Sequence, residues 1–178
     1  KPRRKKPSAS CACMRAILLA LLLPAGAAAA DSGLALHFGR ATGGKDVDIV
    51  RVAYRHALQP DARAWWPTHV QLGASTWWVP DIGGTRRRHD VNATALWRKP
   101  RAWGYFEAGF GPYVLSRTIN NRTTSLPSEL QFGSHVGIGW RVGARATAGL
   151  AIQHISNAGI EQPNGGIDFV QISVTLAL

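Results

Sequence analysis

The chain is dominated by short segments in which apolar residues alternate with polar or small ones. In residues 50–55 every second residue is apolar (Val50, Val52, Tyr54), and two of the other three residues are arginines (Arg51, Arg55). A period of two is typical of a β-strand whose two faces meet different environments. The connections carry turn residues, as in Asp81-Ile82-Gly83-Gly84 and Lys99-Pro100. The pattern predicts eight strands, at residues 34–38, 50–55, 70–78, 91–97, 103–115, 130–140, 144–156 and 170–178.

Eight strands in one domain of this length could form a soluble sandwich, a lipocalin-like barrel or an outer-membrane barrel. The longer segments have about the ten residues that a tilted membrane-spanning strand needs. The sequence therefore favours an all-β fold, an eight-stranded antiparallel transmembrane β-barrel formed by residues 31–178 as a single domain. Seven tryptophans, many beside predicted strand ends, fit the aromatic girdles of such barrels: Trp65, Trp66, Trp77, Trp78, Trp97, Trp103 and Trp140.

Residues 1–30 contain the three regions of a secretory signal peptide in the usual order. Basic residues come first, the apolar run 17–23 follows, and Ala28-Ala29-Ala30 offers a small-residue cleavage site. Met14 is the only methionine and is a candidate for the true translation start. Both cysteines fall in this leader, so no disulfide or thiolate chemistry is expected in residues 31–178.

The leader also carries much of the net charge of +11. It holds six of the 21 basic side chains and no acidic one, which leaves 15 basic against 10 acidic side chains, a net charge of +5. This smaller excess does not indicate nucleic-acid binding. The histidines lack metal-ligand spacing, and no glycine-rich loop joins a strand to a helix. We therefore expect no metal and no cofactor.

A polar trio interrupts the apolar face of the last predicted hairpin. His154 and Ser156 share the parity of Leu150 and Ile152, and Asp168 shares the parity of the apolar residues in the final strand. The three side chains are expected to face lipid, near a turn that is at the cell surface if the N-terminus lies in the periplasm. Histidine can take the proton of a serine hydroxyl while a carboxylate holds the imidazole, which is the chemistry of acyl transfer. The same residues could instead cap a turn, but ionisable groups that face lipid are costly and usually functional.

The motif His154-x-Ser156-Asn157-Ala158-Gly159, followed by Pro163-Asn164-x-Gly166 and an acid at Asp168, resembles the C-terminal signature of the lipid A 3-O-deacylases, the PagL family. The resemblance implies an outer-membrane esterase that removes the acyl chain ester-linked at the 3-position of lipid A. It implies His154 as general base, Ser156 as nucleophile, and Asn157 with nearby backbone as oxyanion hole. The expected third member of the family's triad is a Glu, where this sequence has Asp168, with Glu161 as the fallback.

The resemblance further implies lipopolysaccharide as the partner and the outer membrane as the location. Arg86, Arg87 and Arg88 are then candidates for binding its phosphates. Three alternatives stay open. The chain could be a non-catalytic barrel that forms a pore or binds at the surface, or a soluble periplasmic β-domain for acidic ligands. It could also be an acyltransferase that passes the acyl chain to another lipid instead of water.

Overall fold

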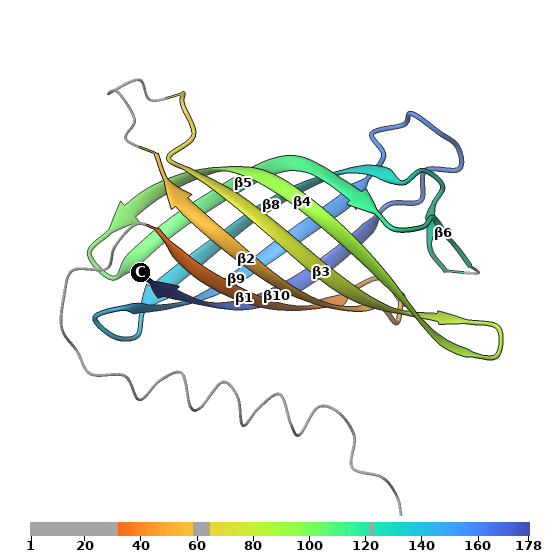
Figure 1. Ribbon diagram of the computed structural model, residues 1–178, viewed down its shortest axis with the longest axis horizontal. Helices are drawn as coiled ribbons and strands as arrows, with labels where there is room; N and C mark the ends of the chain where they lie inside the picture. Colours follow the sequence, from red (N-terminus) through yellow and green to blue (C-terminus); the bar gives the residue numbers. More distant parts are fainter. Residues whose placement is uncertain (1–31, 59–64, 122) are drawn as a thin grey trace, which may run out of the picture.

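The computed structural model describes residues 32–58, 65–121 and 123–178, and the leader predicted at residues 1–30 lies outside them. Eight strands form a closed antiparallel barrel in the order β1-β10-β9-β8-β5-β4-β3-β2, and β6 and β7 form a separate two-stranded sheet (Figure 1). The predicted eight-stranded transmembrane barrel is confirmed. The described ranges contain no helix long and apolar enough to cross a membrane. The strands are β1 (Gly33–Ala41), β2 (Asp48–Ala57), β3 (His69–Asp81), β4 (Gly84–Arg101), β5 (Gly104–Leu115), β6 (Ile119–Asn120), β7 (Ser125–Leu126), β8 (Leu130–Arg141), β9 (Ala146–Ser156) and β10 (Ile167–Ala177).

Strand alternation gives the wall an apolar outer face and a polar inner face. In β2, Val52 and Tyr54 are 57% and 42% exposed, whereas Arg51 and Arg55 are each 2% exposed. Successive side chains of a strand point to opposite faces. The alternate apolar residues that the sequence pattern shows are therefore the ones that point outward. Because Gly33 of β1 pairs with the end of β10, both termini of the barrel lie at one end. We call the opposite end, which carries the β1–β2, β3–β4, β5–β8 and β9–β10 connections, the distal end.

Polar side chains fill the barrel interior. Arg51 Nη2 donates to Gln153 Oε1 at 3.1 Å, and Gln153 Nε2 donates to the Tyr113 hydroxyl at 2.7 Å. Nearer the termini, Glu107 accepts from Arg98 at 2.6 Å and lies 3.6 Å from Arg55. A cavity beside Glu107 has a volume of about 20 Å³, room for about one water molecule. The filled interior argues against the pore alternative.

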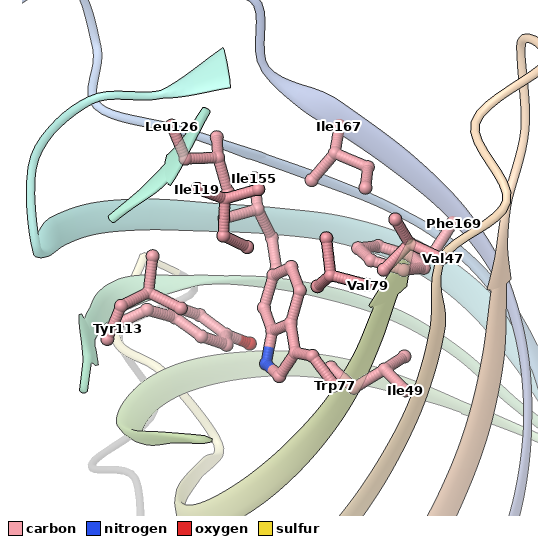
Figure 2. Close-up of a cluster of buried hydrophobic side chains, with 11 residues drawn as sticks. Val47, Ile49, Trp77, Val79, Tyr113, Ile119, Leu126, Ile155, Ile167 and Phe169 are labelled. Atoms are coloured by element: carbon pink, nitrogen blue, oxygen red, sulfur yellow. The ribbon is translucent and has the colours of Figure 1, made fainter. Parts of the chain in front are cut away.

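An apolar cluster closes the interior at the distal end. Its side chains point toward one another from the β1–β2 connection, from β2, β3, β5, β9 and β10, and from the β6–β7 hairpin (Figure 2). The Trp77 and Phe169 rings pack in a T-shaped arrangement with centroids 5.3 Å apart. Ile155 and Ile167, which pair across β9 and β10, are fully buried in this cluster. The distal ends of β9 and β10 are therefore anchored from inside the barrel.

The tryptophans only partly follow the predicted girdle. Trp97, Trp103 and Trp140 are exposed on the outer wall at the end that carries the termini. Trp77 is the exception, because its strand parity turns it inward, where it is fully buried and its Nε1 donates to Asp90 at 2.5 Å. The prediction that all seven tryptophans belong to an interfacial girdle is wrong for this residue.

β4 is longer than predicted at both ends. Lys99 and Pro100 pair with Phe106 and Tyr105 of β5, so the expected turn at Lys99-Pro100 is a strand end. At the distal end β3 and β4 continue as a ribbon to the turn at Ile82 and Gly83. The arginine cluster 86–88 lies in this ribbon and not in a loop. The β6–β7 hairpin was not predicted, because its two-residue strands are too short to show a period.

Candidate functional site

His154 and Asp168 form a cross-strand pair at the distal end of the outer wall. They are register partners in the β9–β10 ladder, which brings their side chains together on one face. His154 Nδ1 lies 2.7 Å from Asp168 Oδ1, and the two side chains are 49% and 57% exposed. The same face carries Ile152 and Val170 one position deeper, exposed as lipid-facing residues are. The pair thus sits at the top of an apolar stripe.

The hydrogen bond determines which imidazole nitrogen can act as a base. An ionised carboxylate only accepts hydrogen bonds, so Nδ1 of His154 carries the hydrogen and donates it to Asp168. Nε2 is then free to accept a proton. Ser156 has the parity of His154 and is half-buried at the end of β9. Within the described ranges its hydroxyl makes no hydrogen bond, so the structure does not join it to His154 Nε2.

The loop between β9 and β10 fits closely around the imidazole. Gly166 has φ +53°, and a Cβ added there would lie 2.8 Å from His154 Cε1. Lys45, from the β1–β2 connection, donates to the carbonyls of Gly166 at 2.6 Å and Gly165 at 3.3 Å. The Thr42 N–H donates to the Asp168 carbonyl at 2.8 Å. The β1–β2 connection therefore holds the segment that faces His154.

Asn157 points away from the outer face. It is fully buried, its Nδ2 donates to the Glu161 carbonyl at 2.8 Å, and its Oδ1 accepts from the Gly159 N–H at 2.9 Å. Its side chain shapes the loop and is not directed at Ser156. The Asn157 N–H instead donates to Asn164 Oδ1 at 3.3 Å, which puts the Asn164 amide beside the peptide that follows the serine. Sequence reasoning gave Asn164 only as part of a motif, because the contact depends on the loop closing.

The carboxylate beside His154 is that of Asp168. Glu161 is exposed in the loop, and its backbone carbonyl accepts the hydrogen bond from Asn157 Nδ2. A second hydroxyl is also close to the imidazole. Ser134 of β8 is the register partner of His154 on the side away from Asp168, and it is exposed. Sequence reasoning missed Ser134, because only the β8–β9 register brings it there.

The structure does not bring the arginine cluster to this site. β4 is separated from β9 by β5 and β8 in one direction, and from β10 by β3, β2 and β1 in the other. Strand alternation also divides the cluster, with Arg87 outward and Arg88 half-buried on the inner parity. Arg86 Nε bonds to Asp81 Oδ2 at 2.7 Å. No group of three or more metal-binding side chains gathers in the part of the chain that the structure describes.

Fold and site together define a class of protein. A closed eight-stranded barrel with an apolar outer wall is a membrane barrel of the outer-membrane type. A His–Asp pair and a serine at the rim of that wall form an arrangement suited to ester hydrolysis. Residues 48–177 match the family described as lipid A 3-O-deacylase (PagL), and the chain belongs to this family.

One sequence relative and two solved structures are similar to this chain. A Bordetella bronchiseptica protein named lipid A deacylase PagL is 38% identical over 110 residues. The match spans 59% of this chain and 59% of that protein's length. The crystal structure of the outer membrane enzyme PagL has a TM-score of 0.64 at 20% identity, covering 82% of this chain and 99% of that one. Neisserial surface protein A (NspA) has a TM-score of 0.56 at 7% identity, covering 83% and 96%. The two solved structures support the barrel fold.

Proposed function

We propose that this barrel hydrolyses the ester-linked acyl chain at the 3-position of lipid A, in the outer leaflet of the outer membrane. The observation that carries the proposal is the hydrogen bond between His154 and Asp168 on the outer wall. His154 precedes Ser156 by two residues in the same strand. A site that faces lipid suits a substrate whose acyl chains lie in lipid. The family to which the chain belongs supports the same reaction.

Ser156 is the proposed nucleophile and His154 the proposed general base. Ser156 Oγ attacks the ester carbonyl carbon while its proton moves to His154 Nε2. Asp168 accepts the Nδ1–H hydrogen bond and stabilises the imidazolium that forms. When the carbon–oxygen bond of the ester breaks, Nε2 returns the proton to the sugar oxygen. Water then attacks the acyl-enzyme, Nε2 takes the water's proton and returns it to Ser156, and a 3-hydroxy fatty acid leaves.

The tetrahedral intermediate needs hydrogen-bond donors for its oxyanion. The side chain of Asn157, proposed from the sequence, is committed to the loop. Asn164 is better placed, because its Oδ1 is held by the Asn157 N–H while its Nδ2 has no partner among the described residues. We therefore assign the donor role to the Asn164 amide. Loss of one such donor typically raises the barrier by about 3–4 kcal/mol.

The test is mass spectrometry of lipid A after incubation with the purified, detergent-folded barrel. The parent protein is compared with Ser156→Ala and with Ser134→Ala, a matched control that removes the other hydroxyl beside His154. The parent and Ser134→Ala are expected to remove one 3-hydroxyacyl group, and Ser156→Ala to remove none.

Each other result contradicts a defined part of the proposal. An unchanged lipid mass with folded parent protein rejects the hydrolase and leaves a non-catalytic barrel. Activity that survives Ser156→Ala but not Ser134→Ala moves the nucleophile to β8. An acyl group that appears on a second lipid instead of as free fatty acid identifies an acyltransferase.

A further inference from the structure

A second row of polar side chains lies on the outer wall, away from His154. Thr76 of β3 and His89 of β4 are register partners, and Thr76 Oγ1 lies 3.1 Å from His89 Nδ1. On the β5 side, the Ser116 hydroxyl accepts from the His89 N–H at 3.0 Å. Trp78 and Arg87 form the next outward pair toward the distal end. Hydroxyl, imidazole and guanidinium groups are thus gathered at a second place on the distal rim of the apolar wall.

An apolar groove runs down the wall below this row. Two hollows, of about 550 and 650 Å³, share Val52, Ala74, Val91 and Val114 and so form one continuous depression across β2 to β5. The hollow nearer the distal end is also lined by Thr76, His89 and Ser116. Small side chains such as Ala74 create the depression, because their larger neighbours stand on either side of it. The groove therefore runs from the polar row toward the end of the barrel that carries the termini, over a mainly apolar lining.

The charges around the row favour an anion. Within the described ranges the Arg87 guanidinium makes no hydrogen bond or ion pair. The acidic groups nearby are already engaged, since Asp81 pairs with Arg86 at 2.7 Å and Asp48 lies 3.8 Å from Arg40. A free guanidinium beside an imidazole and hydroxyl groups is a donor set that suits phosphate oxygens.

We propose that the row and the groove bind a second lipid A molecule, with a phosphate at Arg87 and His89 and an acyl chain along Val91. This inference rests on the proposed function for its choice of lipid, because both sites lie at the distal end and so meet the same leaflet. The second molecule is bound without being hydrolysed. Asp90, the carboxylate next to His89 in the sequence, has the inward parity and accepts from Trp77 and Asn92, so it does not orient His89.

The experiment counts bound lipids by native mass spectrometry of the full-length barrel with the Ser156→Ala substitution, released from detergent after titration with lipid A. Two lipid A molecules per barrel are expected. Arg87→Gln should weaken the second binding event about tenfold, the effect of losing one charge-assisted hydrogen bond. Ala74→Trp should abolish the second event by filling the groove, without changing any charge. Arg101→Gln is the matched control, because Arg101 has the same outward parity at the other end of β4.

A single lipid in the Ser156→Ala barrel overturns the proposal, as does a second lipid that survives both Arg87→Gln and Ala74→Trp. Equal binding of phosphatidylglycerol overturns the assignment to lipid A. A dimer of barrels that disappears with Ala74→Trp shows that another copy occupies the groove. Hydrolysis by the parent protein is measured separately. If a second lipid binds but the parent protein hydrolyses nothing, the proposed function is rejected and the second binding site is retained. If the parent protein hydrolyses lipid A but only one lipid binds, the second binding site is rejected and the proposed function is retained.

Discussion

Gly166 is the residue whose replacement tests the geometry around His154 most directly. Its φ of +53° lies in the left-handed region, and an added Cβ would be 2.8 Å from His154 Cε1 and 3.3 Å from Nε2. Gly166→Ala therefore has two effects. It strains the backbone, and it pushes against the ring atom next to Nε2, the nitrogen to which we assign the serine proton.

Both effects can be given a magnitude. An L-residue in the left-handed region costs about 1–2 kcal/mol. Carbon atoms at contact lie roughly 3.5 Å or more apart, so the ring must move by about 0.7 Å to clear a Cβ at 2.8 Å. Because a misplacement of about 1 Å can lower a rate 100-fold, we expect kcat to fall by about 10- to 100-fold. The free energy of unfolding should fall by only about 1–2 kcal/mol.

Gly159→Ala is the matched control, because Gly159 has φ +84° but no atom within 4 Å of its added Cβ. It should lose similar stability and keep most of the activity. The assay pairs the initial rate of fatty-acid release from lipid A with thermal unfolding of each variant. Full activity in Gly166→Ala, or an equal loss of activity in both variants, would refute the proposed contact between the loop and the imidazole.

Three further changes test the supports of the site. Asp168→Asn removes the charge beside His154 and should lower kcat by roughly 10- to 150-fold, the equivalent of a charged hydrogen bond of about 1.5–3 kcal/mol; its thermal unfolding should barely change, because the pair is about half exposed. Lys45→Met removes the bonds to the Gly165 and Gly166 carbonyls and should speed amide hydrogen exchange in the β9–β10 loop while the barrel strands stay protected. Ile155→Ala should lower the free energy of unfolding by about 2–5 kcal/mol, whereas Ile152→Ala on the lipid side should cost less; equal losses in the two would contradict the buried cluster.

The sequence carried enough information for the wall of the barrel, because alternation is a local property. Val52 and Tyr54 are outward and Arg51 is inward for the same reason that they alternate along the chain. The shared face of His154 and Asp168 follows from the same parity, once the two strands pair as a hairpin. Their direct contact also needs the register, which the turn length alone did not define.

Features that depend on distant segments were beyond the sequence. Ser134 reaches His154 through the β8–β9 register, and Lys45 reaches Gly166 from a connection 121 positions away. The β3–β4 ribbon that holds the arginine cluster was not predicted, because charged residues beyond the apolar zone no longer alternate with apolar ones. The sequence pointed to Asn157 as the donor, and only the closed loop shows that the Asn157 side chain is committed to the loop while Asn164 lies beside it.

The same alternation couples the site to the interior of the barrel. Ile155 lies between His154 and Ser156, and Ile167 and Phe169 flank Asp168, so each outward polar residue is adjacent in sequence to an inward residue of the buried cluster. An exposed polar group at a membrane surface gains little rigidity from its own contacts. Here rigidity is supplied from the other face of the strand, because moving His154 relative to Asp168 would require Ile155 to slide past Ile167 in a closely packed interior. The interior cluster therefore acts as the support of the outer site, and substitutions in it should lower activity as well as stability.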